Sequence, residues 1–264
     1  MKNNDLEKIK QTEMEVMDYI VKVCKKYNIT YYLYFGTLIG AIRHKGFIPW
    51  DDDIDIVMKP DDYMKFLDVI EKEDNDKYYL QNFYNTKRYC FIFSKIRKLH
   101  TTMVEEDWNY LPFKKGINVD IFPMYKYPKS RLGKIRFMYR YKLVSLLLNR
   151  DVKLPGVKGK IINIILHLIP RGLCNKIVIR KHNKMLKYNK DFDEYFTDDF
   201  SFDKNWFEPI VVPFEDRKYV APADYDKILT RQFGDYMTPP PKEEQVGHGG
   251  GKLILSFTKD YDEM

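Results

Sequence analysis

The 264-residue sequence predicts an α/β (α+β) protein whose mixed sheet core is flanked by helices and carries an inserted basic helical lobe. Three observations support this fold class. Helical and strand-like periodicities alternate through the first half of the chain. Hydrophobic residues make up 44% and charged residues 31%, which is typical of a globular protein with a packed core. Between Lys126 and Lys190 there are 18 basic residues and one acidic residue, so this segment carries +17 and the rest of the chain −10.

The first half of the chain is predicted to alternate between helices and strands. Apolar residues at helical spacing indicate the first helix, which would pack one face on the core. Thr37 is expected to cap the second helix, and Pro60 with Asp61 and Asp62 to start the third. The predicted elements are a helix over 5–27, a strand over 31–35 that ends at Gly36, a helix from Thr37 to about Arg43, a strand over 53–58, and a helix from Pro60 to about Glu71.

The second half is predicted to add strands and a helical insertion. Lys and Arg alternate with apolar residues at helical spacing across 130–190, where Pro155-Gly156 and Pro170 separate about three helices. The remaining predicted elements are strands over 78–83, 90–99, 117–122 and 210–212, a helix after Pro222 that ends near Gly234, a loop over 239–251, and an edge strand over 253–257. We therefore divide the chain into a catalytic core (1–125), a basic helical lobe (126–190) and a C-terminal segment (191–264) that packs back on the core.

Cysteine usage and hydropathy predict a cytoplasmic protein. Cys24, Cys90 and Cys174 are dispersed and show no CxxC spacing, which argues against a disulfide framework or a zinc site. The start of the chain is polar, unlike a signal peptide. The longest uncharged apolar run, 161–170, is well short of the ~20 residues that span a bilayer.

An acidic cluster is the main candidate for a functional site. In the run Asp53-Ile54-Asp55-Ile56, alternation places the two carboxylates on one face of a strand. Such carboxylates repel each other unless a cation lies between them, and an oxygen-only pair suits Mg²⁺, or Mn²⁺ in its place. Acidic clusters are usually solvated loops, but the interleaved isoleucines indicate a partly buried site. Asp120, between Val119 and Ile121, repeats the pattern and is the best candidate for a third ligand.

A glycine-bounded segment just before the cluster predicts a phosphate site. Gly36, Thr37 and Gly40 are expected to form a turn whose backbone N–H groups approach a phosphate closely. Arg43 would reach the same phosphate as a planar donor fork. A phosphate cradle beside cation-binding carboxylates points to phosphoryl or nucleotidyl transfer.

These three motifs, in this order, resemble the nucleotidyltransferase superfamily, and the local sequence resembles the LicD family in particular. The LicD family comprises phosphocholine transferases of bacterial surface glycans and is related to the fukutin-type ribitol-phosphate transferases. The resemblance covers roughly residues 8–250. It rests on three stretches: the run from Phe35 to Asp55, the run Val119-Asp120-Ile121-Phe122-Pro123, and the residues Ala221-Pro222, Tyr225, Phe233 to Met237, Pro239-Pro240 and His248.

The resemblance implies a nucleotidyltransferase-like core and transfer from a CDP-alcohol. The donor would be CDP-choline, CDP-ribitol or CDP-glycerol. A sugar hydroxyl of a lipid-linked or surface glycan precursor (teichoic acid, lipopolysaccharide or capsule) would attack the phosphorus, and CMP would leave. Choline would require an aromatic cage, but 21 Tyr, 17 Phe and 3 Trp do not single one out.

Roles for individual residues follow from the motifs and the resemblance together. The expected metal ligands and catalytic residues are Asp53, Asp55 and Asp120, of which Asp120 is alternatively the acceptor of the substrate proton. Asp51 and Asp52 are expected to surround the metal site. Donor-phosphate contacts are expected from Gly36, Thr37, Gly40, Arg43, Arg97 and His248, although a strand arginine such as Arg97 is often structural and a loop histidine is often an inert surface residue.

The basic lobe leaves three interpretations open: RNA binding, a solvated surface, or contact with an anionic membrane leaflet. No RNA-binding motif accompanies the charge, so no specific nucleic acid is expected. Basic amphipathic helices suit an anionic leaflet, and we expect a peripheral protein at the inner face of the plasma membrane. Two other functions remain possible from the sequence: nucleotidyl transfer from an NTP to a small molecule or RNA, and non-catalytic binding of membrane or nucleic acid.

Overall fold

A five-stranded mixed sheet forms the centre of the molecule in the computed structural model, which describes residues 3–247 and 252–264. The strand order is β1-β2-β6-β4-β3. The strands are β1 (Tyr32–Leu33), β2 (Ile54–Met58), β6 (Asn118–Pro123), β4 (Ser94–Lys98) and β3 (Tyr78–Gln81). β2 and β6 run parallel, whereas the other neighbours pair antiparallel, which confirms the predicted mixed sheet.

The register of the three central strands aligns charged residues across the sheet. Asp55 on β2 is the partner of Asp120 on β6, and Asp120 is the partner of Lys95 on β4. Paired residues on adjacent strands project to the same face of a sheet. The fold therefore brings together two carboxylates and one ammonium from distant parts of the chain.

Helices cover this sheet, and the helices predicted over 5–27, from Pro60 and after Pro222 are confirmed. The helices of the core are α1 (Asn3–Tyr27), α2 (Phe35–Ile39), α3 (Pro60–Ile70) and α7 (Tyr225–Phe233). α1 packs against β6 and β4, and α2 packs against β2. Pro60 is the first residue of α3 and Asp61 and Asp62 lie in its first turn, as the sequence predicts.

The predicted glycine turn after β1 is wrong. α2 begins at Phe35 and continues into a π-helical turn, Gly40–His44, so Gly36, Thr37 and Gly40 are all helical. Tyr34 is the N-cap of α2, and the hydroxyl of Thr37 caps nothing. The predicted strand is correspondingly shorter, because its last residues turn into the helix.

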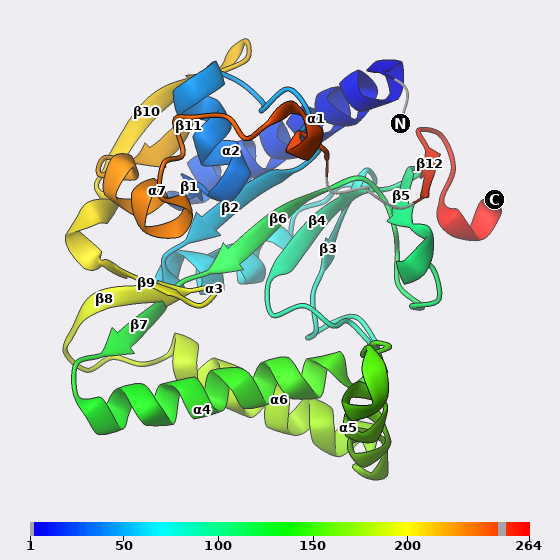
Figure 1. Cartoon of the computed structure of the whole chain (residues 1–264), viewed down its shortest axis with the longest axis vertical. Coiled ribbons are helices and arrows are strands. Elements are labelled where there is room, and N and C mark those ends of the chain that lie inside the picture. Colours follow the sequence, from blue (N-terminus) through cyan, green and yellow to red (C-terminus); the bar gives the residue numbers. More distant parts are fainter. Residues whose placement is uncertain (1–2, 248–251) are drawn as a thin grey trace.

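The basic lobe is a helical excursion between two paired strands. Its helices are α4 (Arg131–Leu148), α5 (Gly156–Leu168) and α6 (Arg171–Leu186), which form a separate layer at the lower end of Figure 1. β7 (Tyr125–Pro128) leads into the lobe and β8 (Phe192–Thr197) leaves it, and the two strands pair antiparallel. β9 (Phe200–Asp203) completes this three-stranded sheet. The sequence predicts the helices but not these strands.

The lobe is joined to the core by a buried histidine. Nδ1 of His182 on α6 lies 2.7 Å from the hydroxyl of Tyr84, and Nε2 lies 2.8 Å from the hydroxyl of Tyr125. Burial lowers the pKa of His182 to about 3, so the ring is neutral at physiological pH. A continuous apolar cluster runs from α1 through the sheet to α4 and α6. The lobe and the core therefore share one hydrophobic interior.

Two further pairs of strands lie outside the central sheet. β10 (Pro209–Phe214) and β11 (Arg217–Pro222) form a hairpin, where the sequence predicts one of the two strands. The predicted C-terminal edge strand is confirmed as β12 (Leu253–Ser256), which pairs with β5 (Thr102–Glu105).

In the described parts of the chain, no single helix has both the length and the apolar character needed to cross a membrane. α5 and α6 reach that length and apolar composition only when the two helices are taken together, and they are bent by 97° relative to each other.

Candidate active site

The predicted acidic residues lie where two cavities adjoin. The aromatic cavity, of about 360 Å³, lies against β4, β5 and β6 and is lined mainly by Phe91, Phe93, Met103, Trp108 and Phe113. The α2 cavity, of about 460 Å³, is lined mainly by Phe35, Gly36, Trp50, Phe122 and Phe233. Asp53 and Asp120 line both cavities. A molecule bound across them would therefore pass the carboxylates at its midpoint.

Asp55 is held at this junction by the backbone. Its side chain is buried beside the α2 cavity, and its N–H donates to Oγ1 of Thr37 at 2.8 Å. Burial, and then repulsion by Asp53 and Asp120, raise the pKa of Asp55 well above its usual range. Such a site favours uptake of a cation, because a bound cation would stabilise the charged carboxylate.

Asp51 and Asp52 are also buried, and their role around a metal stays a prediction. Asp51 lines the α2 cavity and Asp52 lines the aromatic cavity. Gly36 is required here because a Cβ at this position would lie 2.6 Å from Oδ2 of Asp51. The first glycine of the motif therefore makes room for a carboxylate and borders the cavity, although it does not form a turn.

Lys95 is a site residue that the sequence analysis missed. Its Nζ donates to Oδ1 and Oδ2 of Asp120 at 2.6 and 2.7 Å, and Nδ2 of Asn118 donates to Oδ1 of the same carboxylate at 2.6 Å. The ion pair is largely buried. Lys95 therefore orients Asp120 and places a positive charge at the junction of the cavities.

Glu13 is the second missed residue. It comes from α1, is 1% exposed and lines the aromatic cavity. Within the described residues its Oε2 is buried without a hydrogen-bond partner. Burial, and then repulsion by Asp53, Asp52, Asp120 and Asp51, raise its pKa well above the usual range. A signal was present in the sequence, because Glu13 occupies the apolar stripe formed by Ile9, Val16, Met17 and Ile20.

The donor set fits a hard divalent cation. Seven carboxylates line the two cavities, from Glu13, Asp51, Asp52, Asp53, Asp55, Glu105 and Asp120, whereas the basic lining residues are Lys95 and Arg97. Carboxylate oxygens are the ligands that Mg²⁺ prefers. The orphaned Oε2 of Glu13 is the kind of atom that a cation or its water would satisfy. Assignment of Asp53, Asp55 and Asp120 as the ligands remains a prediction.

The other predicted phosphate contacts are engaged elsewhere in the fold. Gly40 packs closely on the following loop, since a Cβ there would lie 2.4 Å from the carbonyl oxygen of Gly46. Arg43 donates from Nη1 to the carbonyl of Tyr236 at 2.5 Å and from Nε to His44 at 2.9 Å. Neither residue lines the two cavities. Gly40 and Arg43 thus have structural roles in packing and hydrogen bonding, and their role as phosphate ligands stays a prediction.

Arg97 does line the aromatic cavity, but its guanidinium is buried and bonded. Nε donates to Oε1 of Gln81 at 2.5 Å, and Nη1 donates to the carbonyl of Gly116 and to Oδ1 of Asn118 at 2.6 and 2.7 Å. Through Asn118 it also supports Asp120 indirectly. The structural alternative considered for this arginine thus has direct support. His248 lies outside the described residues, next to Gly247, which packs close to Trp50 and Asp52.

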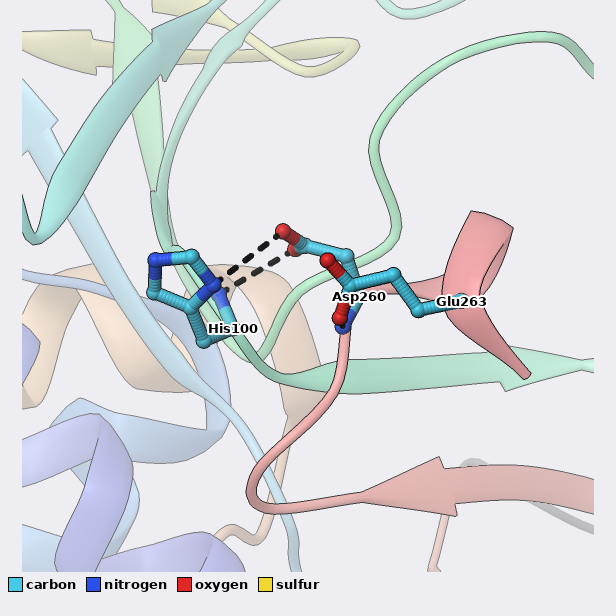
Figure 2. Close-up of side chains that lie close together, drawn as sticks. All are labelled: His100, Asp260 and Glu263. Atoms are coloured by element: carbon cyan, nitrogen blue, oxygen red, sulfur yellow. Dashed lines mark hydrogen bonds and ion pairs between the residues drawn. The ribbon is translucent and has the colours of Figure 1, made fainter.

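A separate group of three potential ligands lies near the C-terminus. His100, Asp260 and Glu263 bring one ligand atom each within 4.8 Å of one another, and Figure 2 shows the three side chains close together; His100 and Glu263 are exposed and Asp260 is half-buried. Asp260 accepts from the N–H of His100 at 3.1 Å and forms a capping box with Glu263. These contacts explain why the three side chains lie together: they anchor the C-terminal segment.

Comparison with known proteins covers the part of the chain that carries the site. The family model described as LicD/FKTN/FKRP, nucleotidyltransferase domain, matches residues 28–145, a range that includes Asp53, Asp55, Lys95 and Asp120. The match ends within α4, so most of the basic lobe lies beyond it.

Relatives extend the likeness to most of the chain. The chain is 29% identical over 248 residues to the "Lipopolysaccharide cholinephosphotransferase LicD" of Haemophilus influenzae, covering 89% of this chain and 92% of that protein. Uncharacterized proteins of Rickettsia typhi and Rickettsia prowazekii are 47% and 44% identical over 45 residues, which is 17% of this chain. Beside its mixed sheet and its ordered acidic motifs, the chain therefore carries a LicD-type nucleotidyltransferase match over residues 28–145 and is similar to the Haemophilus LicD protein over most of its length.

Proposed function

We propose that this protein transfers phosphocholine from CDP-choline to a sugar hydroxyl of a cell-surface glycan precursor and releases CMP. The LicD-type match and the Haemophilus relative indicate a phosphotransferase enzyme, in contrast to a non-catalytic binding protein. The name of the Haemophilus relative supports choline and a lipopolysaccharide-type acceptor. The observation that carries the proposal is the position of Asp53 and Asp120 between two cavities, which suits a group passed between two substrates.

In this proposal the carboxylates organise the reacting phosphate. Asp53, Asp55 and Asp120 would hold Mg²⁺, which when bound supplies charge neutralisation at the phosphate oxygens. Thr37 fixes the backbone of Asp55, and Lys95 fixes the carboxylate of Asp120. The oxygens of Asp120 already accept from Lys95 and Asn118, so we assign Asp120 as a ligand rather than as the proton acceptor.

Calorimetric titration with Mg²⁺ tests the donor. CDP-choline, CDP-ribitol, CDP-glycerol and CTP are compared on the wild type and on Asp53→Ala. We expect selective binding of CDP-choline that falls at least about tenfold in the variant, because the cation site is lost. Selective binding of another CDP-alcohol would change the group transferred. Preference for CTP, with pyrophosphate as product, would indicate nucleotidyl transfer and refute the proposal.

We further propose that the basic lobe docks on an anionic bilayer at the cytoplasmic face of the membrane, where a lipid-linked glycan would be presented. α5 leaves most of its apolar side chains in solvent, with exposed fractions between 38% and 78%. The exposed apolar side chains of α5 are those of Val157, Ile161, Ile162, Ile164, Ile165 and Leu168. Lys158 and Lys160 lie on the same helix. An exposed apolar face set among basic residues matches the headgroup region of an anionic leaflet.

Vesicle pelleting at increasing salt tests this surface. We expect the wild type to pellet with vesicles that contain anionic lipid, to be released as salt screens the charges, and to ignore purely zwitterionic vesicles. The triple variant Ile161→Ser, Ile164→Ser and Leu168→Ser should weaken binding about tenfold or more, since apolar area no longer enters the interface. Val211→Ser, which changes an exposed apolar residue on β10, is the matched control. Equal pelleting of the triple variant and the wild type would contradict the proposal.

A further inference from the structure

Four partly buried aromatic residues form one wall of the aromatic cavity beside the carboxylates. Phe91, Phe93, Trp108 and Phe113 all line it. The ring centroids of Phe91 and Phe93 are 5.1 Å apart, and those of Phe91 and Trp108 are 5.9 Å apart with 32° between the ring planes. Met103, Val104 and Leu253 complete the apolar lining. The rings come from the segment before β4 and from the segment between β5 and β6, so only the fold brings them together.

The faces of these rings already receive a cation. Nζ of Lys95 lies 5.2 Å from the ring centroid of Phe91 and 5.1 Å from that of Phe93. This is the distance range of cation–π attraction. Trp108 and Phe113 extend the same aromatic wall around the cavity. The wall therefore offers further π surface to a ligand cation of larger size.

The charge of the cavity favours a cationic ligand. Its lining includes the carboxylates of Glu13, Asp52, Asp53, Glu105 and Asp120, against the two basic groups of Lys95 and Arg97. A polyol placed against the aromatic wall would leave its hydroxyls without hydrogen-bond partners, which is costly. A quaternary ammonium has no N–H or O–H to satisfy and gains from both the ring faces and the carboxylates.

We propose that the aromatic cavity is the binding site for the quaternary ammonium of the transferred alcohol, with Phe91, Phe93, Trp108 and Phe113 as its aromatic cage. This inference rests on the proposed function, and it identifies the group that distinguishes choline from ribitol or glycerol. The cytidine of the donor then occupies the α2 cavity, on the other side of Asp53 and Asp120.

Paired titrations of CDP-choline and CDP-glycerol test the cage, because these donors share the nucleotide and differ in the alcohol. The variants are Trp108→Leu and Phe91→Leu, which keep apolar bulk but remove the π face. Trp206→Leu is the matched control, since Trp206 is a partly buried tryptophan outside both cavities. We expect the wild-type preference for CDP-choline to fall about tenfold in the two cage variants, with CDP-glycerol affinity unchanged.

Other outcomes separate the cage from the proposed function. An unchanged preference in both cage variants would overturn the cage. Equal loss of CDP-choline, CDP-glycerol and CMP would show that this cavity holds the nucleotide, which also overturns it. If the wild type binds no CDP-alcohol, the proposed function fails, and the cage is then decided by tetramethylammonium alone, titrated by tryptophan fluorescence. Saturable binding that is lost in Phe91→Leu, which keeps the Trp108 fluorophore, supports the cage, and absence of such binding to the wild type refutes it.

Discussion

Replacing Asp55 with asparagine is expected to abolish transfer while making the metal-free protein more stable. Asp55 is 8% exposed, and its charge is opposed by burial and by the carboxylates of Asp53 and Asp120. The substitution keeps the shape but removes that charge, so the melting temperature in EDTA should rise by about 2 to 4 °C, which corresponds to about 1 kcal/mol. Loss of one predicted ligand should reduce turnover by about 10³-fold, or about 4 kcal/mol of barrier.

Thermal melting in EDTA and in Mg²⁺, together with CMP release from the donor, measures both effects. Mg²⁺ should stabilise the wild type and have little effect on Asp55→Asn. The matched control is Asp61→Asn, which changes an exposed aspartate in the first turn of α3 that pairs with Lys126. This control should retain activity. A variant that is both active and less stable would show that Asp55 is a structural residue.

Replacing Lys95 with methionine is expected to impair catalysis and tighten metal binding. The ammonium holds both oxygens of Asp120 and lies at the junction of the two cavities. Its loss removes a positive charge next to the proposed cation site, so Mg²⁺ affinity should rise about fivefold, or about 1 kcal/mol. Turnover should fall about 100-fold, because a preorganised charge near the reacting phosphate is lost.

Mg²⁺ titration by calorimetry and steady-state turnover separate these two effects. Lys95→Arg should recover part of the turnover, since it restores the charge. Lys98→Met is the matched control, because Lys98 lies on the same strand and pairs with Glu15 on the surface. If Lys95→Met weakens Mg²⁺ binding and turnover in parallel, the lysine serves only to hold Asp120 in place.

Alternation allowed the central strands of the site to be predicted. A period of two predicts strands around Asp55 and Asp120, and it predicts one face for Asp53 and Asp55. Both strands are confirmed, although β2 begins only at Ile54; the pairing of Asp55 with Asp120 follows from the sheet and not from the local pattern. The start of the helix after β1 is predicted too late, at Thr37, because Gly36 suggests a turn. The helix in fact starts at Phe35, one residue before that glycine. The sequence does not reveal that Gly36 is needed to leave room for the carboxylate of Asp51.

Lys95, Glu13 and the aromatic cage depend on contacts that local patterns do not encode. Lys95 lies 25 residues from Asp120 in the chain, and the two residues meet only because the sheet order makes β4 and β6 neighbours. The strand predicted over 90–99 begins only at Ser94, so Phe91 and Phe93 lie outside it and border the cavity instead. With 38 Phe and Tyr residues in the chain, composition cannot select the few that face a ligand.

The parallel pairing of β2 and β6 makes the active site sensitive to the number of residues in these two strands as well as to their identity. Asp55 faces Asp120 because each strand presents alternate residues to the same side. One residue inserted or deleted ahead of either aspartate within these strands would turn one carboxylate towards the apolar interior. An insertion or deletion within 54–58 or 118–123 would therefore disrupt the site even where every catalytic residue is retained.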